Sequence, residues 1–181
     1  MKKKYPARTC GVIRRIPQFG LLLSMIGLLS CASGGLSYNG KQAKPESLVP
    51  LIRGDAHELR WQTNDIIING TYILEGNELI LAGQVDLQSR LANFPVVDFL
   101  RVNAYAVDGD GLILASYRLW TATPGSELFF VKWTFQQQYA VPEATQTVAF
   151  GYQGRMRDGG ARGFWGGLDN GGTSWDFWYT P

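Results

Sequence analysis

The chain has 181 residues, and its 17 Lys and Arg against 15 Asp and Glu give a formal net charge of +2. Six of the basic residues lie within the first thirty positions, which hold no acid. Residues 31–181 therefore carry 11 basic and 15 acidic side chains, a net charge of −4. The basic character of the whole chain gives no reason to expect a nucleic-acid partner, because it belongs to a segment with the features of a removable signal.

An uncharged apolar run, GLLLSMIGLLS, occupies residues 20–30. Eleven residues are too few to cross about 30 Å of hydrocarbon as a helix, and they match the apolar core of a signal peptide. An uncleaved anchor and an ordinary secretory signal remain open alternatives. A start at Val12 instead of Met1 would shorten the unusually long basic leader and is also left open.

The apolar run ends in the sequence LLSC at residues 28–31, which resembles the lipobox of bacterial lipoproteins: a Leu three positions before the Cys and a small residue directly before it. The resemblance implies that residues 1–30 are a cleaved signal peptide. It also implies that Cys31 becomes the lipidated N-terminus, with a diacylglyceryl group on its sulfur and an acyl chain such as palmitate on its amine. Ala32, in place of Asp, implies the outer membrane of the cell envelope where the source has one.

Cys10 and Cys31 are the two cysteines of the chain. Removal of the signal and lipidation of Cys31 would leave the mature protein no thiol to pair, so its stability must come from its core. No motif for a metal ion or a cofactor stands out. The covalent lipid is the one non-protein group that we predict.

Composition divides the mature chain at about residue 50. Residues 31–50 are rich in Gly, Ser and Pro and have no sustained periodicity, which predicts a flexible tether between the lipid and a folded domain. Residues 51–181 are predicted to form that domain. The one short helix that we expect in it lies around residues 53–61.

Alternation of apolar and polar side chains dominates the chain after residue 65 and predicts antiparallel strands. The turn sequences EGN at residues 75–77 and DGDG at residues 108–111 separate two pairs of these strands as hairpins. About seven strands with Gly and Pro between them predict a single immunoglobulin-like β-sandwich. The predicted strands are 66–74, 78–88, 100–107, 112–120, 129–139, 146–152 and 174–179.

Residues 96–114 (VVDFLRVNAYAVDGDGLIL) place an apolar strand, an acidic Gly-containing turn and a second strand in series. This arrangement resembles the middle of immunoglobulin-like and FxLYD-type extracytoplasmic domains of bacterial lipoproteins. The aromatic-Leu-Tyr-Asp string of the FxLYD type is absent, and NAYA stands in its region. The resemblance covers less than a third of the mature chain, and it implies the fold and no activity.

His57 is the one histidine, so neither a zinc site nor a His-based triad is indicated, and we expect it at the surface. Asp108 and Asp110 are the most evident pair of acids. Two acids beside glycines can ligate Ca²⁺, but the fuller ligand series of a calcium loop is missing and a hairpin turn explains the same residues. No two carboxylates are placed together as glycoside hydrolysis requires, so we predict no catalytic residue.

The region 154–172 combines eight glycines with several arginines and aromatic residues. Disordered tails seldom carry so many aromatic side chains. We expect residues 174–179 to be a structural last strand, and the GFWGG sequence before it to be an exposed loop that binds a sugar ring or a protein. The candidate binding residues are Arg162, Phe164, Trp165, Asp169 and Asn170.

Together these observations predict a lipid-anchored envelope protein with a non-catalytic accessory or scaffold role and a protein partner. A module that binds carbohydrate or peptidoglycan through the Gly-rich aromatic loop is the alternative. A hydrolase that uses carboxylates alone is a third interpretation.

Overall fold

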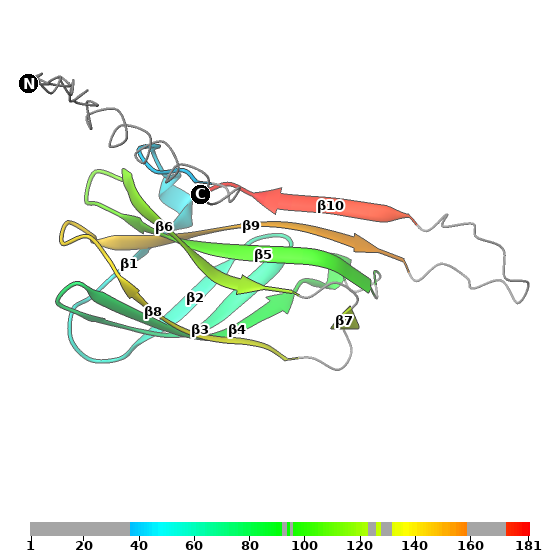
Figure 1. Ribbon diagram of the computed structural model, residues 1–181, viewed down its shortest axis with the longest axis horizontal. Helices are drawn as coiled ribbons and strands as arrows, with labels where there is room; N and C mark the ends of the chain where they lie inside the picture. The colour runs from blue at the N-terminus through cyan, green and yellow to red at the C-terminus, as the bar shows by residue number, and fades with distance from the viewer. Residues whose placement is uncertain (1–36, 92–93, 95, 123–125, 128–131, 159–172) are drawn as a thin grey trace, which may run out of the picture. The chain divides into compact units, whose positions relative to one another are not determined.

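Two antiparallel β-sheets pack face to face and enclose an apolar core (Figure 1). The computed structural model describes residues 37–91, 94, 96–122, 126–127, 132–158 and 173–181. These residues belong to one compact unit, Ser37–Pro181, which holds its own core. The predicted class, an all-β sandwich of antiparallel strands, is confirmed, with ten strands in the described part of the chain instead of about seven.

Strand β9 is the centre of the six-stranded sheet. It pairs with β5 along one side, and with β1 and then β10 along the other. Both β6 and β7 pair with the far side of β5. The strands of this sheet are β1 (Leu48–Pro50), β5 (Val96–Val107), β6 (Ile113–Thr121), β7 (Ser126–Glu127), β9 (Thr147–Arg157) and β10 (Ser174–Tyr179).

A four-stranded sheet in the order β2-β3-β4-β8 forms the second layer. After the meander β2–β4 the chain crosses to form β5 and β6, returns as β8 beside β4, and crosses again to form β9 beside β5. The strands of this layer are β2 (His57–Gln62), β3 (Ile66–Glu75), β4 (Glu78–Leu87) and β8 (Trp133–Ala140).

The described helices are two short 3₁₀ segments, η3 (Pro45–Ser47) and η4 (Ser89–Leu91). Segment η3 leads directly into β1, and η4 lies in the connection from β4 to β5. No helix in the described residues has the length and apolar character that a membrane span needs.

Inward-facing side chains of the two sheets build the core. Trp61 of β2 packs against Phe150 of β9 and Tyr179 of β10, with ring centroids 5.5 and 5.4 Å apart. The side chains predicted to share one face of β9, among them Val148 and Tyr152, are fully buried. Burying one large apolar side chain contributes about 1.5–3 kcal/mol, so this interface supplies most of the stability.

The prediction of a short helix around residues 53–61 is wrong. Residues 57–62 form β2, which pairs along its whole length with β3. Leu59 and Trp61 are buried while Glu58 and Arg60 are exposed. That alternation has the period of a half-buried strand, which decides the structure against a helix.

The folded domain begins earlier than predicted, so the flexible tether does not extend to residue 50. Residues 48–50 form β1 and pair with residues 147–149 of β9. The backbone N–H groups of Gly40 and Ala43 donate to carbonyls at the start of β6 and in the turn before it, each at 2.8 Å. The first six residues of the predicted tether lie outside the described part of the chain.

A second apolar cluster lies on the outer face of the six-stranded sheet. Tyr105, Ile113 and Ala149 point away from the main core and pack with Tyr38 and Ala43. The rings of Tyr38 and Tyr105 meet edge to face, 5.7 Å apart, and burial raises the pKa of Tyr105 to about 12. Residues 38–43 therefore form a cover over part of this face.

Ala43→Asp is expected to lower the free energy of unfolding by about 2–4 kcal/mol, because the new carboxylate would be buried among apolar groups. Lys41→Asp is the matched control: it adds the same group two residues away, at an exposed position, and should change stability little. Thermal unfolding of residues 31–181 measures both. Equal effects of the two substitutions would contradict the cover.

Candidate functional site

A buried carboxylate lies where the β2–β3 turn meets the connection from β4 to β5. Asp65 is 5% exposed. Its Oδ1 accepts two hydrogen bonds from Arg90, one of them from Nε at 2.6 Å, and its Oδ2 accepts one from the Tyr152 hydroxyl at 2.6 Å. Because Arg90 belongs to η4 and Tyr152 to β9, three distant parts of the chain meet at this side chain.

Thr63 shapes the turn that carries Asp65. Its Oγ1 accepts the backbone N–H groups of Asp65 and Ile66, each at 3.2 Å, and lies 2.9 Å from the Tyr152 hydroxyl oxygen. The N–H of Gln88 donates to the Asp65 carbonyl at 2.7 Å. Side-chain bonds to nearby backbone groups are how Thr stabilises turns, so the turn and the β4–β5 connection are held in fixed positions.

The protonation of Tyr152 suits its place beside Asp65. Burial raises the pKa of Tyr152 above its ordinary value, and the hydrogen bond to Asp65 acts in the same direction. The phenol therefore stays protonated and donates to the carboxylate. In the ion pair of Arg90 with Asp65, the Arg90 side chain is 48% exposed and the Asp65 side chain 6%. The acid is therefore buried and the guanidinium reaches solvent.

An open depression of about 340 Å³ adjoins this cluster, a volume within the range of small-molecule sites. Amide, hydroxyl and guanidinium groups line it, and no carboxylate does. The lining residues are Gln62, Thr63, Asn64, Gln88, Ser89 and Arg90.

The lining can both donate and accept hydrogen bonds. Arg90 commits Nε and Nη2 to Asp65, which fixes the guanidinium plane and leaves its other N–H donors at the depression. Gln62 and Asn64 are exposed, and Gln88 is half-buried with its Nε2 donating to the Thr63 carbonyl at 3.3 Å. A frame fixed in this way suits a ligand that carries several hydroxyl groups.

Residues 174–179 form β10, so the prediction of a structural last strand is confirmed. Phe177 is buried, whereas Trp175 and Trp178 are 45% and 66% exposed. Trp175 lies beside Phe94 of the β4–β5 connection, with ring centroids 6.3 Å apart. Among the described strands β10 pairs with β9 alone, which leaves its second edge unpaired there.

The predicted loop site falls between β9 and β10, outside the described residues. Its five candidate binding residues, Arg162, Phe164, Trp165, Asp169 and Asn170, therefore stay a prediction. The depression at the β2–β3 turn is a different site, which sequence reasoning missed.

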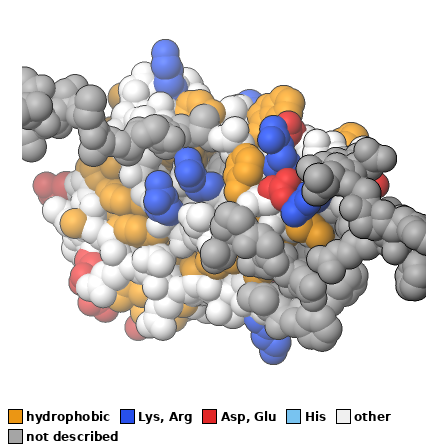
Figure 2. Space-filling view, turned by 45° about the vertical axis from the view of Figure 1, so that its right-hand side comes forward, with side chains coloured by type: hydrophobic (Ala, Val, Ile, Leu, Met, Phe, Trp, Pro, Cys, Tyr) orange, Lys and Arg blue, Asp and Glu red, His pale blue; other side chains and the backbone are white. Residues whose placement is uncertain are grey.

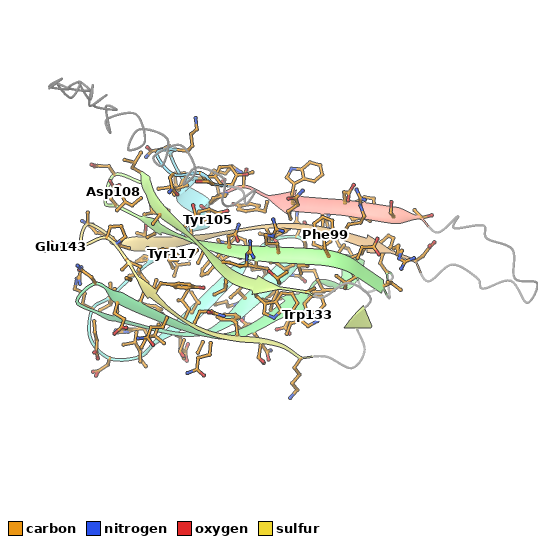
Figure 3. The ribbon with its side chains drawn as sticks, viewed as in Figure 1. Phe99, Tyr105, Asp108, Tyr117, Trp133 and Glu143 are labelled. Atoms are coloured by element: carbon orange, nitrogen blue, oxygen red, sulfur yellow. The ribbon has the colours of Figure 1, made fainter. Side chains whose placement is uncertain are left out.

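Asp108 and Asp110 lie in the hairpin turn between β5 and β6, where Figure 3 marks Asp108. The Asp108 Oδ1 accepts the N–H groups of Asp110 at 3.0 Å and Leu112 at 2.8 Å. Gly111 adopts a φ of 84°, which a Gly allows without strain. These contacts are those of a turn. Over the described ranges, no group of three or more His, Cys, Asp or Glu is placed to hold a metal ion.

His57 is half-buried in β2, where we expected a surface residue. Its ring stacks on that of Tyr72, with centroids 5.4 Å apart. The Tyr72 hydroxyl in turn donates to the Pro50 carbonyl at 3.2 Å. The imidazole therefore packs on a ring of β3 whose hydroxyl reaches the end of β1.

Comparison of the chain with models of known families, with curated proteins and with solved structures finds no match. The geometry of the molecule is therefore the basis on which its function is inferred.

Asp65→Asn is expected to lower the free energy of unfolding by about 2–3 kcal/mol, because it removes charge-assisted hydrogen bonds from a buried site. Asp176→Asn is the matched control. Asp176 also pairs with an arginine, Arg155, at 2.7 Å, but both side chains are about half exposed and water can replace the lost partner. Urea unfolding compares the two, and equal losses would show that Asp65 has no special structural role.

Proposed function

We propose that the chain is the precursor of a lipid-anchored envelope protein whose β-sandwich binds a glycan in the depression between the β2–β3 turn and η4. The observation that carries the proposal is the preorganised polar lining, in which a buried carboxylate fixes an arginine at the surface. The proposed role is accessory and non-catalytic: the domain holds an envelope polysaccharide close to the membrane.

Glycans suit this lining for a chemical reason. Sugar hydroxyls both donate and accept hydrogen bonds, and the amides of Gln62, Asn64 and Gln88 and the hydroxyl of Ser89 offer both functions. The guanidinium of Arg90 adds a planar set of donors for a sugar carboxylate or a pair of hydroxyls. An apolar ligand would take water from the amides of Gln62 and Asn64 and from the remaining N–H groups of Arg90 and give them no partner in return, which is costly.

The proposed lipid on Cys31 would place the domain near the membrane surface. Ser37 is the first described residue and stands six positions after Cys31. A fully extended chain of that length reaches about 20 Å. The domain would therefore work within about 20 Å of its anchor, a distance suited to holding a polymer close to the bilayer.

Cys31→Ser is expected to release the protein from membranes and to leave the domain folded, because the lipid attachment is lost and residues 37–181 are unchanged. The intact mass of the protein from its native membranes reports the lipid, and membrane fractionation reports the release. Retention of residues 1–30 in both the wild type and the variant would overturn the proposed anchor.

Arg90→Lys is expected to weaken glycan binding by about tenfold or more, because Lys keeps the positive charge beside Asp65 but loses the planar donor set. Asn64→Ala should also weaken binding, and it leaves the Asp65 cluster intact. Binding is measured from amide chemical shifts of residues 31–181 during titration with soluble peptidoglycan fragments and other envelope oligosaccharides.

Gln136→Ala, at an exposed position of β8, is the matched control for this titration and should leave binding unchanged. Shifts that leave residues 62–64 and 88–90 unaffected would place the ligand elsewhere. Failure of every oligosaccharide to bind at millimolar concentration would overturn the glycan proposal.

A protein partner is the second candidate, and β10 favours it. The strand has an unpaired edge in the described part of the chain, and Trp175 is exposed beside Phe94 at its start. Such an edge can add an extended segment of another protein as a further strand, with Trp175 as the side-chain contact. Trp175→Ser separates the two candidates, because it should prevent capture of a protein and leave the oligosaccharide titration unchanged.

A further inference from the structure

The outer face of the six-stranded sheet is defined by the alternation of β9. Ala149 points to this face, where it is buried under the cover of residues 38–43. Side chains at even spacing from it along the strand point the same way, so Gln153, Arg155 and Arg157 share the face and are exposed. Beyond the cover, the part of this face along the second half of β9 is therefore open to solvent in the described structure.

A large aromatic side chain stands on the same face. Trp178 of β10 lies opposite Gln153 in the strand register, so both side chains project outward. At 66% it is the most exposed large hydrophobic side chain of the described residues. Trp combines an apolar ring system with a polar N–H, and proteins concentrate it at the boundary between lipid and water.

Basic side chains share this face with the tryptophan. Figure 2 shows a view in which Lys and Arg side chains lie beside hydrophobic ones across the upper and middle parts of the molecule. The outward-facing positions of this sheet and residues 38–46 hold six cations against three acids: Lys41, Lys44, Arg101, Arg118, Arg155 and Arg157 against Glu46, Asp98 and Asp176. This excess of three positive charges contrasts with the net charge of −4 of residues 31–181.

The opposite side of the sandwich has the reverse sign. On the outward-facing positions of the four-stranded sheet, β2, β3 and β4 carry four acids and one base: Glu58, Glu75, Glu78 and Asp86 against Arg60. A molecule with one basic and one acidic face is oriented by an anionic surface, and each basic side chain near such a surface adds to the attraction.

The start of the described chain lies on the basic face. Tyr38 packs on Tyr105 there, and Asn39 accepts a hydrogen bond from Ser116 of β6 at 2.6 Å. Cys31 is separated from Ser37 by six positions, a reach of about 20 Å. A lipid on Cys31 would therefore enter the bilayer close to this face and far more readily than beside the acidic one.

We infer that the outer face of the six-stranded sheet rests on an anionic lipid bilayer. The inference rests on the proposed lipid anchor. Lys41 and Arg118 meet the phosphate groups of the lipids, and Trp178 enters the interface between headgroups and acyl chains. The same contact directs the four-stranded layer, with its polar depression, away from the membrane.

The first experiment removes the anchor and tests the face alone. Residues 31–181 with Cys31→Ser are floated with vesicles of phosphatidylglycerol and phosphatidylcholine, and with vesicles of phosphatidylcholine only. We expect binding to the anionic vesicles that falls about fivefold for each of Lys41→Gln and Arg118→Gln, that falls with Trp178→Ser, and that weakens with salt. Arg60→Gln, on the acidic side, is the matched control and should have no effect.

The second experiment uses the full lipidated protein in anionic vesicles. An environment-sensitive fluorophore is attached to Gln153→Cys on the basic face, or to Thr71→Cys on the outer face of the four-stranded sheet. Quenching by brominated lipid at residue 153 and none at residue 71 is the expected result. Equal responses, or protection of residue 153 from a water-soluble quencher without quenching by lipid, would overturn the inference.

The two experiments separate the face from the anchor. If the lipidated protein stays on vesicles but the two labels respond equally, the proposed lipid anchor is upheld and the proposed membrane contact of the six-stranded sheet is refuted. A protein that carries no lipid refutes the anchor, and the flotation of the Cys31→Ser chain still decides the face. No binding to anionic vesicles in flotation together with equal label responses would refute the face outright.

Discussion

The interface between the two sheets is the constraint on which the rest of the fold depends, because no cysteine lies between residues 37 and 181 to join them covalently. Apolar burial supplies most of the free energy, but it has no direction and does not by itself select one alignment of the layers. The hydrogen bond from Tyr152 to Asp65 is directional and joins the two layers, so it selects one alignment. A slip of β9 by one residue would turn Tyr152 outward and leave Oδ2 of the buried Asp65 carboxylate without its donor. The same bond fixes the β2–β3 turn over β9, and through Arg90 it fixes η4, so the alignment of the sheets and the shape of the depression are set by one polar cluster.

Local patterns decided which strands the sequence could predict. Strands β3 and β4 lie within one residue of their predicted bounds, because two alternating runs are separated by a short turn and pair directly with each other. Strand β2 was mistaken for a helix because only Leu59 and Trp61 of its six residues face the core, which is too little alternation to recognise beside four polar residues. The segment before β1 was mistaken for a tether because its Gly- and Ser-rich composition has no pattern of its own. Its structure comes from the β5–β6 hairpin and from β9, which follow much later in the chain.

The candidate site could not be predicted from the sequence for a similar reason. Asp65 stands 25 residues from Arg90 and 87 from Tyr152, and no spacing rule connects them. Sequence reasoning favours acids that are neighbours, such as Asp108 and Asp110, but neighbouring acids beside glycines are also what a tight turn needs. A single acid in a short turn gives no local signal that it is buried. The signal that exists is indirect: an Asp directly before the Ile-rich start of a strand must either be exposed or find partners, and only the folded structure supplies them.

The proposed anchor, the basic face and the depression fit together in one orientation. A long flexible tether would let the domain turn freely above the membrane, whereas the five residues between Cys31 and Ser37 restrict it. Within that restriction the charges determine which face meets the membrane, because turning the molecule over would bring the acidic side toward anionic lipid. It would also require the short connection to pass around the domain. The lining of the depression comes from the β2–β3 turn and from η4, both attached to the four-stranded layer, and stacked sheets lie about 10 Å apart. With the six-stranded sheet against the bilayer, the depression therefore belongs to the layer farther from the lipid, where a polymer lying over the membrane can reach it.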